Sequence, residues 1–82
     1  MRDRSIPAGA AAEAIADVLE RSRGARPQVS ADTELDRLGL ESVEVVEVFV
    51  LLEERTGLVV STPDLNELRV VRDVEKLKAI EI

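Results

Sequence analysis

The sequence predicts an all-α fold: a small four-helix bundle with three main helices, one short helix and a long first loop. Two observations predict it. Apolar residues recur at three- and four-residue spacing in the segments 8–22 and 42–56, as on one face of a helix. Glycines and prolines stand between these segments, where helices end. Because 82 residues suffice for one small core, we predict a single domain over residues 8–82, preceded by a flexible N-terminus at residues 1–7.

The first main helix is predicted from Pro7 to about Ser22. Proline is favoured in the first turn of a helix, and Ile15, Val18 and Leu19 join several alanines on one apolar face. The glycine and the proline that follow end this helix, and a loop runs on to residue 31.

A short turn of helix is predicted around Leu35 and Leu38. Asp32-Thr33 offers caps for its start, and Gly39 ends it in the manner of a C-cap glycine. The two leucines would pin the long first loop to the core.

The second main helix is predicted to begin at Ser42, with this serine as its N-cap. The valines of this segment favour a strand locally, but β-branched residues cost only a few tenths of a kcal/mol each in a helix. The helical period therefore decides the assignment. Gly57 ends the helix, and its buried face is predicted to comprise Val45, Val48, Phe49 and Leu52.

The C-terminal third is predicted to hold two more helices. Residues 58–60 are either a short extended segment or an apolar loop. Thr62 and Pro63 are a helix-start signal for a short helix that extends through Leu68. The last main helix is expected from Arg72 to Ala79, with Val71, Val74 and Leu77 as its buried residues.

The composition excludes several classes of chemistry. The chain has no cysteine, histidine, tryptophan or tyrosine, so thiol catalysis, disulfides, the usual zinc ligands and imidazole acid–base catalysis are excluded. We therefore expect no catalytic residue and no metal site, and a carrier or binding module in place of an enzyme. The first residues lack the apolar core of a signal peptide, and no apolar run approaches the roughly 20 residues of a membrane span. A cytoplasmic protein without a membrane partner is expected.

The net charge of −6 is concentrated in one segment. Residues 32–54 hold eight carboxylates against the single Arg37, whereas the segments on either side sum to +1 and zero. Such a segment repels phosphate backbones, which argues against nucleic acid as a partner. A basic protein surface is the complementary expectation.

Three stretches of the sequence resemble the acyl carrier protein family. Leu38-Gly39-Leu40-Glu41-Ser42-Val43-Glu44 is similar to the family signature, in which an acid and a serine follow a leucine–glycine pair. The segment 52–57 resembles the end of the family's second helix, and 70–74 resembles the entry to its last helix. The resemblance covers roughly residues 8–80 and implies a bundle of acyl-carrier type, with 8–82 as a single carrier domain.

The resemblance implies a function for Ser42. In the family this serine is esterified by 4'-phosphopantetheine from coenzyme A, through a separate phosphopantetheinyl transferase. The terminal thiol of that arm then holds acyl groups as thioesters. The chain would be a discrete, non-catalytic carrier that shuttles acyl intermediates between enzymes of fatty-acid-like or polyketide and other secondary-metabolite biosynthesis.

The helix that begins at Ser42 is the expected docking surface for partner enzymes. A helical wheel places Glu44, Glu47 and Glu54 opposite the buried face, with additional apolar residues between them. Acidic groups would meet basic patches of acyl-loading, condensing or other acyl-processing enzymes, and the apolar groups would fill small pockets. We expect docking by Glu41, Val43, Glu44, Glu47, Val50, Glu53 and Glu54. No heptad seam favours dimerisation, so a monomer is expected.

Two alternatives stay open. One is a stand-alone aminoacyl or peptidyl carrier protein, which would use Ser42 in the same way. The other is an unmodified acidic helical adaptor, in which Ser42 is only a helix cap and no cargo is carried.

Overall fold

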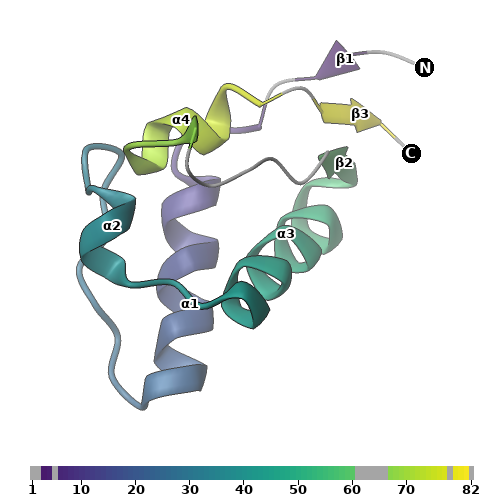
Figure 1. Cartoon of the computed structure of the whole chain (residues 1–82). Helices are drawn as coiled ribbons and strands as arrows, with labels where there is room; N and C mark the ends of the chain where they lie inside the picture. Colours follow the sequence, from purple (N-terminus) through teal and green to yellow (C-terminus); the bar gives the residue numbers. More distant parts are fainter. Residues whose placement is uncertain (1–2, 5, 61–66, 78, 82) are drawn as a thin grey trace.

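The computed structural model describes residues 3–4, 6–60, 67–77 and 79–81 (Figure 1). Within these residues the protein is mostly helical, with three short strands, and the predicted fold class is confirmed. The helices are α1 (Ala10–Arg23), α2 (Leu35–Leu38), α3 (Ser42–Thr56) and α4 (Val71–Glu75), and the strands are β1 (Asp3–Arg4), β2 (Leu58–Val60) and β3 (Ala79–Glu81).

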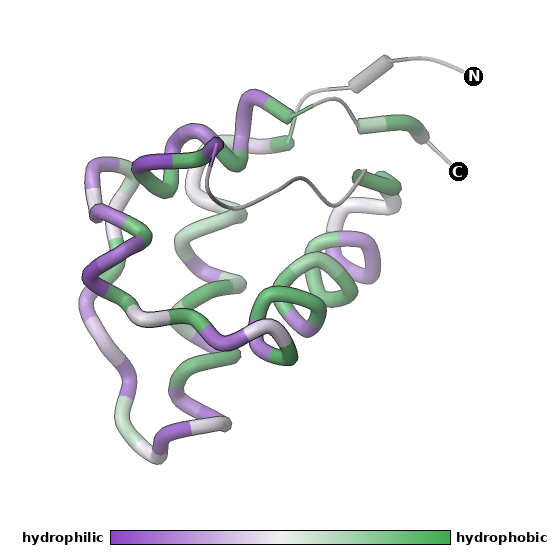
Figure 2. The backbone as a smooth tube through the Cα atoms, in the orientation of Figure 1, coloured by the Kyte–Doolittle hydropathy of each residue, from purple (hydrophilic) through white to green (hydrophobic). Residues whose placement is uncertain are grey.

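The core lies between α1, α3 and α4. Hydrophobic and hydrophilic positions alternate along α1 and α3 with the helical period (Figure 2). Both predicted apolar faces are confirmed. The buried residues of the two helices are Ala11, Ala14, Ile15, Ala16, Val18 and Leu19 in α1, and Glu44, Val45, Val48, Phe49 and Leu52 in α3.

The helices end where the glycines predict. Gly39 and Gly57 have φ angles of 57° and 71°. These lie in the left-handed region, which favours glycine because the Cβ atom of other residues makes this conformation unfavourable. The amide of Gly57 donates to the carbonyl of Glu53 at 2.9 Å, which satisfies an otherwise free group of the last turn of α3. The chain can therefore turn sharply after α2 and after α3.

The predicted helix caps are wrong by one or two positions. Ser42 is the first helical residue of α3, and the cap position is occupied by Glu41, whose backbone is extended. The cap position of α2 is Glu34. The Thr33 hydroxyl instead accepts a 2.8 Å hydrogen bond from the amide of Ser30, so it closes a turn before the helix.

The long first loop is fastened to the start of α4. The amide of Leu35 donates to the carbonyl of Arg69 at 2.9 Å, and the amides of Val71 and Arg72 donate back to the loop at 3.0 and 2.8 Å. Leu35 and Leu38 are buried, which confirms that they anchor the loop. At the entry to α4, the Asp73 carboxylate accepts hydrogen bonds from two backbone amides, and these lower its pKa.

The last helix is shorter than predicted. α4 ends at Glu75 instead of Ala79, and residues 79–81 form β3, the middle strand of an antiparallel sheet with the order β1-β3-β2. Ile80 faces residue 3 on one side and Val59 on the other. Pairing of β3 with a strand on each side gives more of its backbone N–H and C=O groups a hydrogen-bond partner than a frayed helix end would. Of the two alternatives for residues 58–60, the extended one is correct.

Residues 3–4 and Ile6, in the N-terminal segment, take part in the fold. β1 pairs with β3, and Ile6 is buried in the core with 4% of its surface exposed. The domain boundary predicted at residue 8 therefore leaves out a core residue. The predicted short helix that opens at Thr62 falls mostly on residues 61–66, outside the described residues. In the part of the chain that the structure covers, no helix is long and apolar enough to cross a membrane.

Candidate functional site

Ser42 lies at an exposed position where the chain enters α3. It follows the extended residue Glu41 and begins a helix of 15 residues. The first amides of a helix have no partner within it, and the helix dipole makes this end positive. A phosphate ester on this side chain would therefore meet a favourable electrostatic environment.

Arg23, the last residue of α1, forms hydrogen bonds with the backbone of the segment that leads to Ser42. Its guanidinium donates from Nη1 to the carbonyl of Leu38 and from Nη2 to the carbonyl of Gly39, both at 2.8 Å. These carbonyls belong to the end of α2, where the helix supplies no further donors. The side chain of Arg23 is 43% exposed, so the contact lies at the rim of the core.

Glu44 completes this network from the first turn of α3. Its Oε1 accepts hydrogen bonds from Nη2 of Arg23 and from the backbone amide of Glu41, both at 2.9 Å, and Oε2 lies 3.3 Å from Nε of Arg23. The hydrogen bond to Arg23 and the one to the Glu41 amide lower the pKa of Glu44 from 4.5 to about 2. A carboxylate that is ionised at neutral pH therefore joins α1 to the backbone directly before Ser42.

The predicted exposure of Glu44 is wrong, since the residue is only 2% exposed. Position 44 lies one turn before the buried Val48, so it borders the apolar face of α3, and the end of α1 covers it there. Burial of the charge is tolerated because Arg23 and a backbone amide compensate it. Glu44 is therefore unavailable to a docking partner in this conformation.

The other predicted docking residues are exposed. Val43 and Val50 have 60% and 49% of their surfaces exposed, and Val46, which is not among the predicted docking residues, has 56%. The three valines follow the spacing of one helical stripe that begins next to Ser42. The exposed carboxylates of this region are Glu41 at the cap position and Glu47, Glu53 and Glu54 on the helix.

A shallow groove of about 300 Å³ runs beside this stripe, between α3 and the end of α1. Its apolar lining comes from Val46, Val50 and Leu51. Arg21, Glu47 and Glu54 supply its charged rim.

A comparison with protein families decides which family the chain belongs to. Residues 10–77 match the family model described as a phosphopantetheine attachment site. The chain belongs to this family. It is therefore a phosphopantetheine carrier protein, and the expected resemblance to acyl carrier proteins is confirmed. No curated protein and no solved structure matches the chain.

Phosphopantetheine carrier domains bind 4'-phosphopantetheine covalently and are generally non-catalytic. They work with a phosphopantetheinyl transferase and with acyl-processing enzymes. The residues of this carrier fit the group, because Ser42 is exposed at a positive helix end and the nearest buried carboxylate, Glu44, is neutralised by Arg23.

Arg23 is the residue of this site that the sequence reasoning missed. Arg23 and Glu44 are 21 positions apart, and no local rule joins them. One signal was available: Glu44 stands three residues after Glu41, the spacing of a capping box. With Ser42 as the predicted cap, the residue three positions later is Val45, which cannot complete a capping box.

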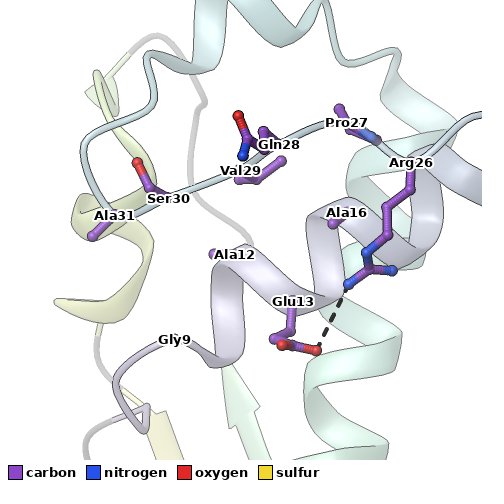
Figure 3. A pocket seen from close by; sticks show the side chains of 10 residues that line it. All are labelled: Gly9, Ala12, Glu13, Ala16, Arg26, Pro27, Gln28, Val29, Ser30 and Ala31. Carbon is purple, nitrogen blue, oxygen red and sulfur yellow. Dashed lines mark ion pairs between the residues drawn. The ribbon is translucent and has the colours of Figure 1, made fainter.

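A second groove, of about 430 Å³, lies between the first half of α1 and the loop that follows it (Figure 3). Ala12 and Ala16 of α1 lie opposite Val29 of the loop, and Arg26 reaches Glu13 with an N···O distance of 3.8 Å. None of its lining residues belongs to the segment 38–44, so this groove is separate from the surroundings of Ser42.

Proposed function

We propose that the protein is a discrete acyl carrier in which Ser42 is the attachment point of 4'-phosphopantetheine. The exposed position of Ser42 at the start of α3, within the segment that the family model matches, supports this proposal most directly. When bound, the group supplies a terminal thiol that holds an acyl group as a thioester.

The attachment step is a phosphoryl transfer from coenzyme A. Oγ of Ser42 bonds to the phosphorus that carries the pantetheine arm, and the bond from that phosphorus to adenosine 3',5'-bisphosphate breaks. The hydroxyl proton passes to a base of the transferase, in keeping with the absence of histidine from the chain. The contribution of the carrier is to present the hydroxyl at an exposed, positively polarised helix end.

We propose that partner enzymes dock on the exposed face of α3. The docking surface comprises Glu41, Val43, Glu47, Val50, Glu53 and Glu54, to which we add Val46. Glu44 is left out because it is buried and paired with Arg23. The carboxylates would steer basic patches of the partners toward the arm, and the valines would fill small apolar pockets. Association through such a surface weakens as salt screens the charges.

The proposed cargo is an acyl intermediate of fatty-acid-like or polyketide biosynthesis, carried by a monomer in the cytoplasm. The excess of acid on α3 favours partners with basic docking sites. Loading of the modified protein by an acyl-activating enzyme, compared with loading by an amino-acid-adenylating enzyme, separates the acyl carrier from the aminoacyl carrier.

The decisive experiment is the intact mass of the protein before and after incubation with coenzyme A and a broad-specificity phosphopantetheinyl transferase. We expect the gain of one phosphopantetheine, and we expect Ser42→Ala to lose it. Ser30→Ala, which changes an exposed serine of the first loop, is the matched control and is expected to keep the gain. No gain in a protein that circular dichroism shows to be folded would favour the unmodified adaptor. A gain that survives in Ser42→Ala would place the attachment at another residue.

A further inference from the structure

The backbone around Ser42 is held by polar contacts more than by the core. Between the buried residues Leu38 and Glu44, the chain is exposed at Gly39, Glu41 and Ser42. Leu40 packs against the core only partly. Without further contacts this segment would have considerable freedom, because few buried apolar groups restrain it.

Arg23 and Glu44 supply those contacts. The guanidinium of Arg23 reaches the carbonyls of Leu38 and Gly39 on one side and the carboxylate of Glu44 on the other. The same carboxylate accepts the amide of Glu41. One arginine of α1 thus connects the end of α2 with the start of α3, and each of its contacts lies within four residues of Ser42.

A planar guanidinium suits this task better than an ammonium group does. Its donors form a rigid fork that can bind two carbonyls and a carboxylate at once. It also cancels the charge of Glu44, which would otherwise repel the diphosphate of coenzyme A beside the reacting hydroxyl. The pair therefore affects both the geometry and the electrostatics of the attachment point.

We propose that Arg23 and Glu44 are positioning residues for the modification of Ser42. They hold the Glu41–Ser42 backbone in the conformation in which the transferase receives the hydroxyl. This inference rests on the proposed function of Ser42. Neither side chain bonds to the transferred group; both act through the backbone of the segment 38–42. A segment that is already ordered in the free protein reacts faster, because the entropy cost of ordering it does not have to be met in the complex with the transferase.

The test is the steady-state kinetics of transferase modification of the unmodified protein at saturating coenzyme A. Arg23→Gln is expected to lower kcat/KM by about tenfold or more, because small displacements of reacting groups have effects of this size. The loss is expected mainly in kcat. KM for the carrier is expected to stay within about twofold of the wild type, since the docking surface on α3 is unchanged.

Arg26→Gln is the matched control. Arg26, in the loop directly after α1, also pairs with several acids, but its partners are Glu13, Asp17 and Glu20 of α1. It makes none of the contacts that Arg23 makes to the segment 38–44, so its replacement is expected to leave both kinetic constants within about twofold of the wild type.

Hydrogen exchange at the amide of Glu41 provides a second measurement. This amide donates to Glu44 in the folded protein, and its exchange is expected to accelerate in Arg23→Gln and not in Arg26→Gln. If Arg23→Gln fails to fold, Arg23→Lys replaces it. Lysine keeps the positive charge but not the forked set of donors. We therefore expect the kcat of Arg23→Lys to be lower than that of the wild type, but higher than that of a variant without any of the Arg23 contacts.

The outcomes distinguish this inference from the function on which it rests. Modification of the wild type together with an unchanged kcat in Arg23→Gln and Arg23→Lys would overturn the positioning role and leave Ser42 as the attachment point. A change confined to KM, with kcat unchanged, would assign Arg23 to docking and would also overturn the positioning role. Failure of the wild type itself to be modified at Ser42 would overturn the proposed function, and the positioning role with it.

Discussion

Replacement of Glu44 by glutamine is expected to destabilise the protein at neutral pH and to have little effect near pH 2. The pKa of Glu44 is about 2 in the folded protein, against an ordinary value of 4.5, because of the hydrogen bonds to Arg23 and to the amide of Glu41. A carboxyl whose pKa is lowered by folding stabilises the folded state above pH 4.5. That stabilisation is lost as the pH falls through the folded-state pKa.

The magnitude follows from the same pKa difference. A factor of ten in acidity corresponds to about 1.4 kcal/mol, so the full difference would contribute about 3 kcal/mol. Water screens the pair from the side of Arg23, whose side chain is 43% exposed. We therefore expect Glu44→Gln to lower the free energy of unfolding by about 1–2 kcal/mol at pH 7.

Urea unfolding followed by far-ultraviolet circular dichroism from pH 7 to pH 2 measures this difference, since the chain has neither tryptophan nor tyrosine for fluorescence. Asp17 and Asp73 also have lowered pKa values, but they titrate in both proteins and their effects cancel in the comparison. Glu53→Gln, at an exposed position of the same helix, is the control for the loss of one carboxylate and is expected to change the free energy of unfolding at pH 7 by less than about 0.5 kcal/mol. A destabilisation by Glu44→Gln that is equally large at pH 7 and at pH 2 would refute the reasoning.

Three further predictions concern the core, the turn before Ser42 and the docking surface. Leu52→Ala is expected to lower the free energy of unfolding by about 2–5 kcal/mol, because Leu52 is fully buried; its urea midpoint measures this, and a loss below 1 kcal/mol would contradict it. Gly39→Ala is expected to cost about 1 kcal/mol in the same assay, since its φ is 57° although no atom would contact the added methyl group; an unchanged midpoint would contradict this. The double variant Glu47→Gln with Glu54→Gln is expected to slow association with the transferase at low salt and to match the wild type at high salt. Stopped-flow measurements at both salt concentrations test this, and a difference that does not depend on salt would count against electrostatic steering.

Much of the fold could be predicted because it depends on local rules. The spacing of apolar residues was sufficient to identify α1 and α3 and the buried face that contains Val48 and Leu52. The ends of helices at Gly39 and Gly57 follow from the backbone freedom of glycine alone. The position of Ser42 at the start of α3 was likewise accessible from the sequence, although its role as N-cap was not correct.

Apart from the helix caps, the incorrect predictions concern contacts between distant segments. β3 exists because residues 79–81 pair with β1 near the start of the sequence and with β2 directly after α3, and no property of these three residues predicts both partners. Glu44 looked exposed because a helical wheel orders side chains around one helix but does not say which neighbour covers them. The contact that Arg23 makes from α1 decides its burial.

The position of the sheet has a consequence for how the protein can be tethered. β2 follows the end of α3 directly and pairs with β3, which in turn pairs with β1, so the first and last strands meet at that end of the molecule (Figure 1). The start of α3 lies about 22 Å away along a helix of 15 residues. A resin, an affinity tag or a fused domain attached beside β1 or β3 is therefore held at the opposite end from Ser42. A protein immobilised in this way is expected to keep its serine turned toward the solution, where soluble enzymes can reach it.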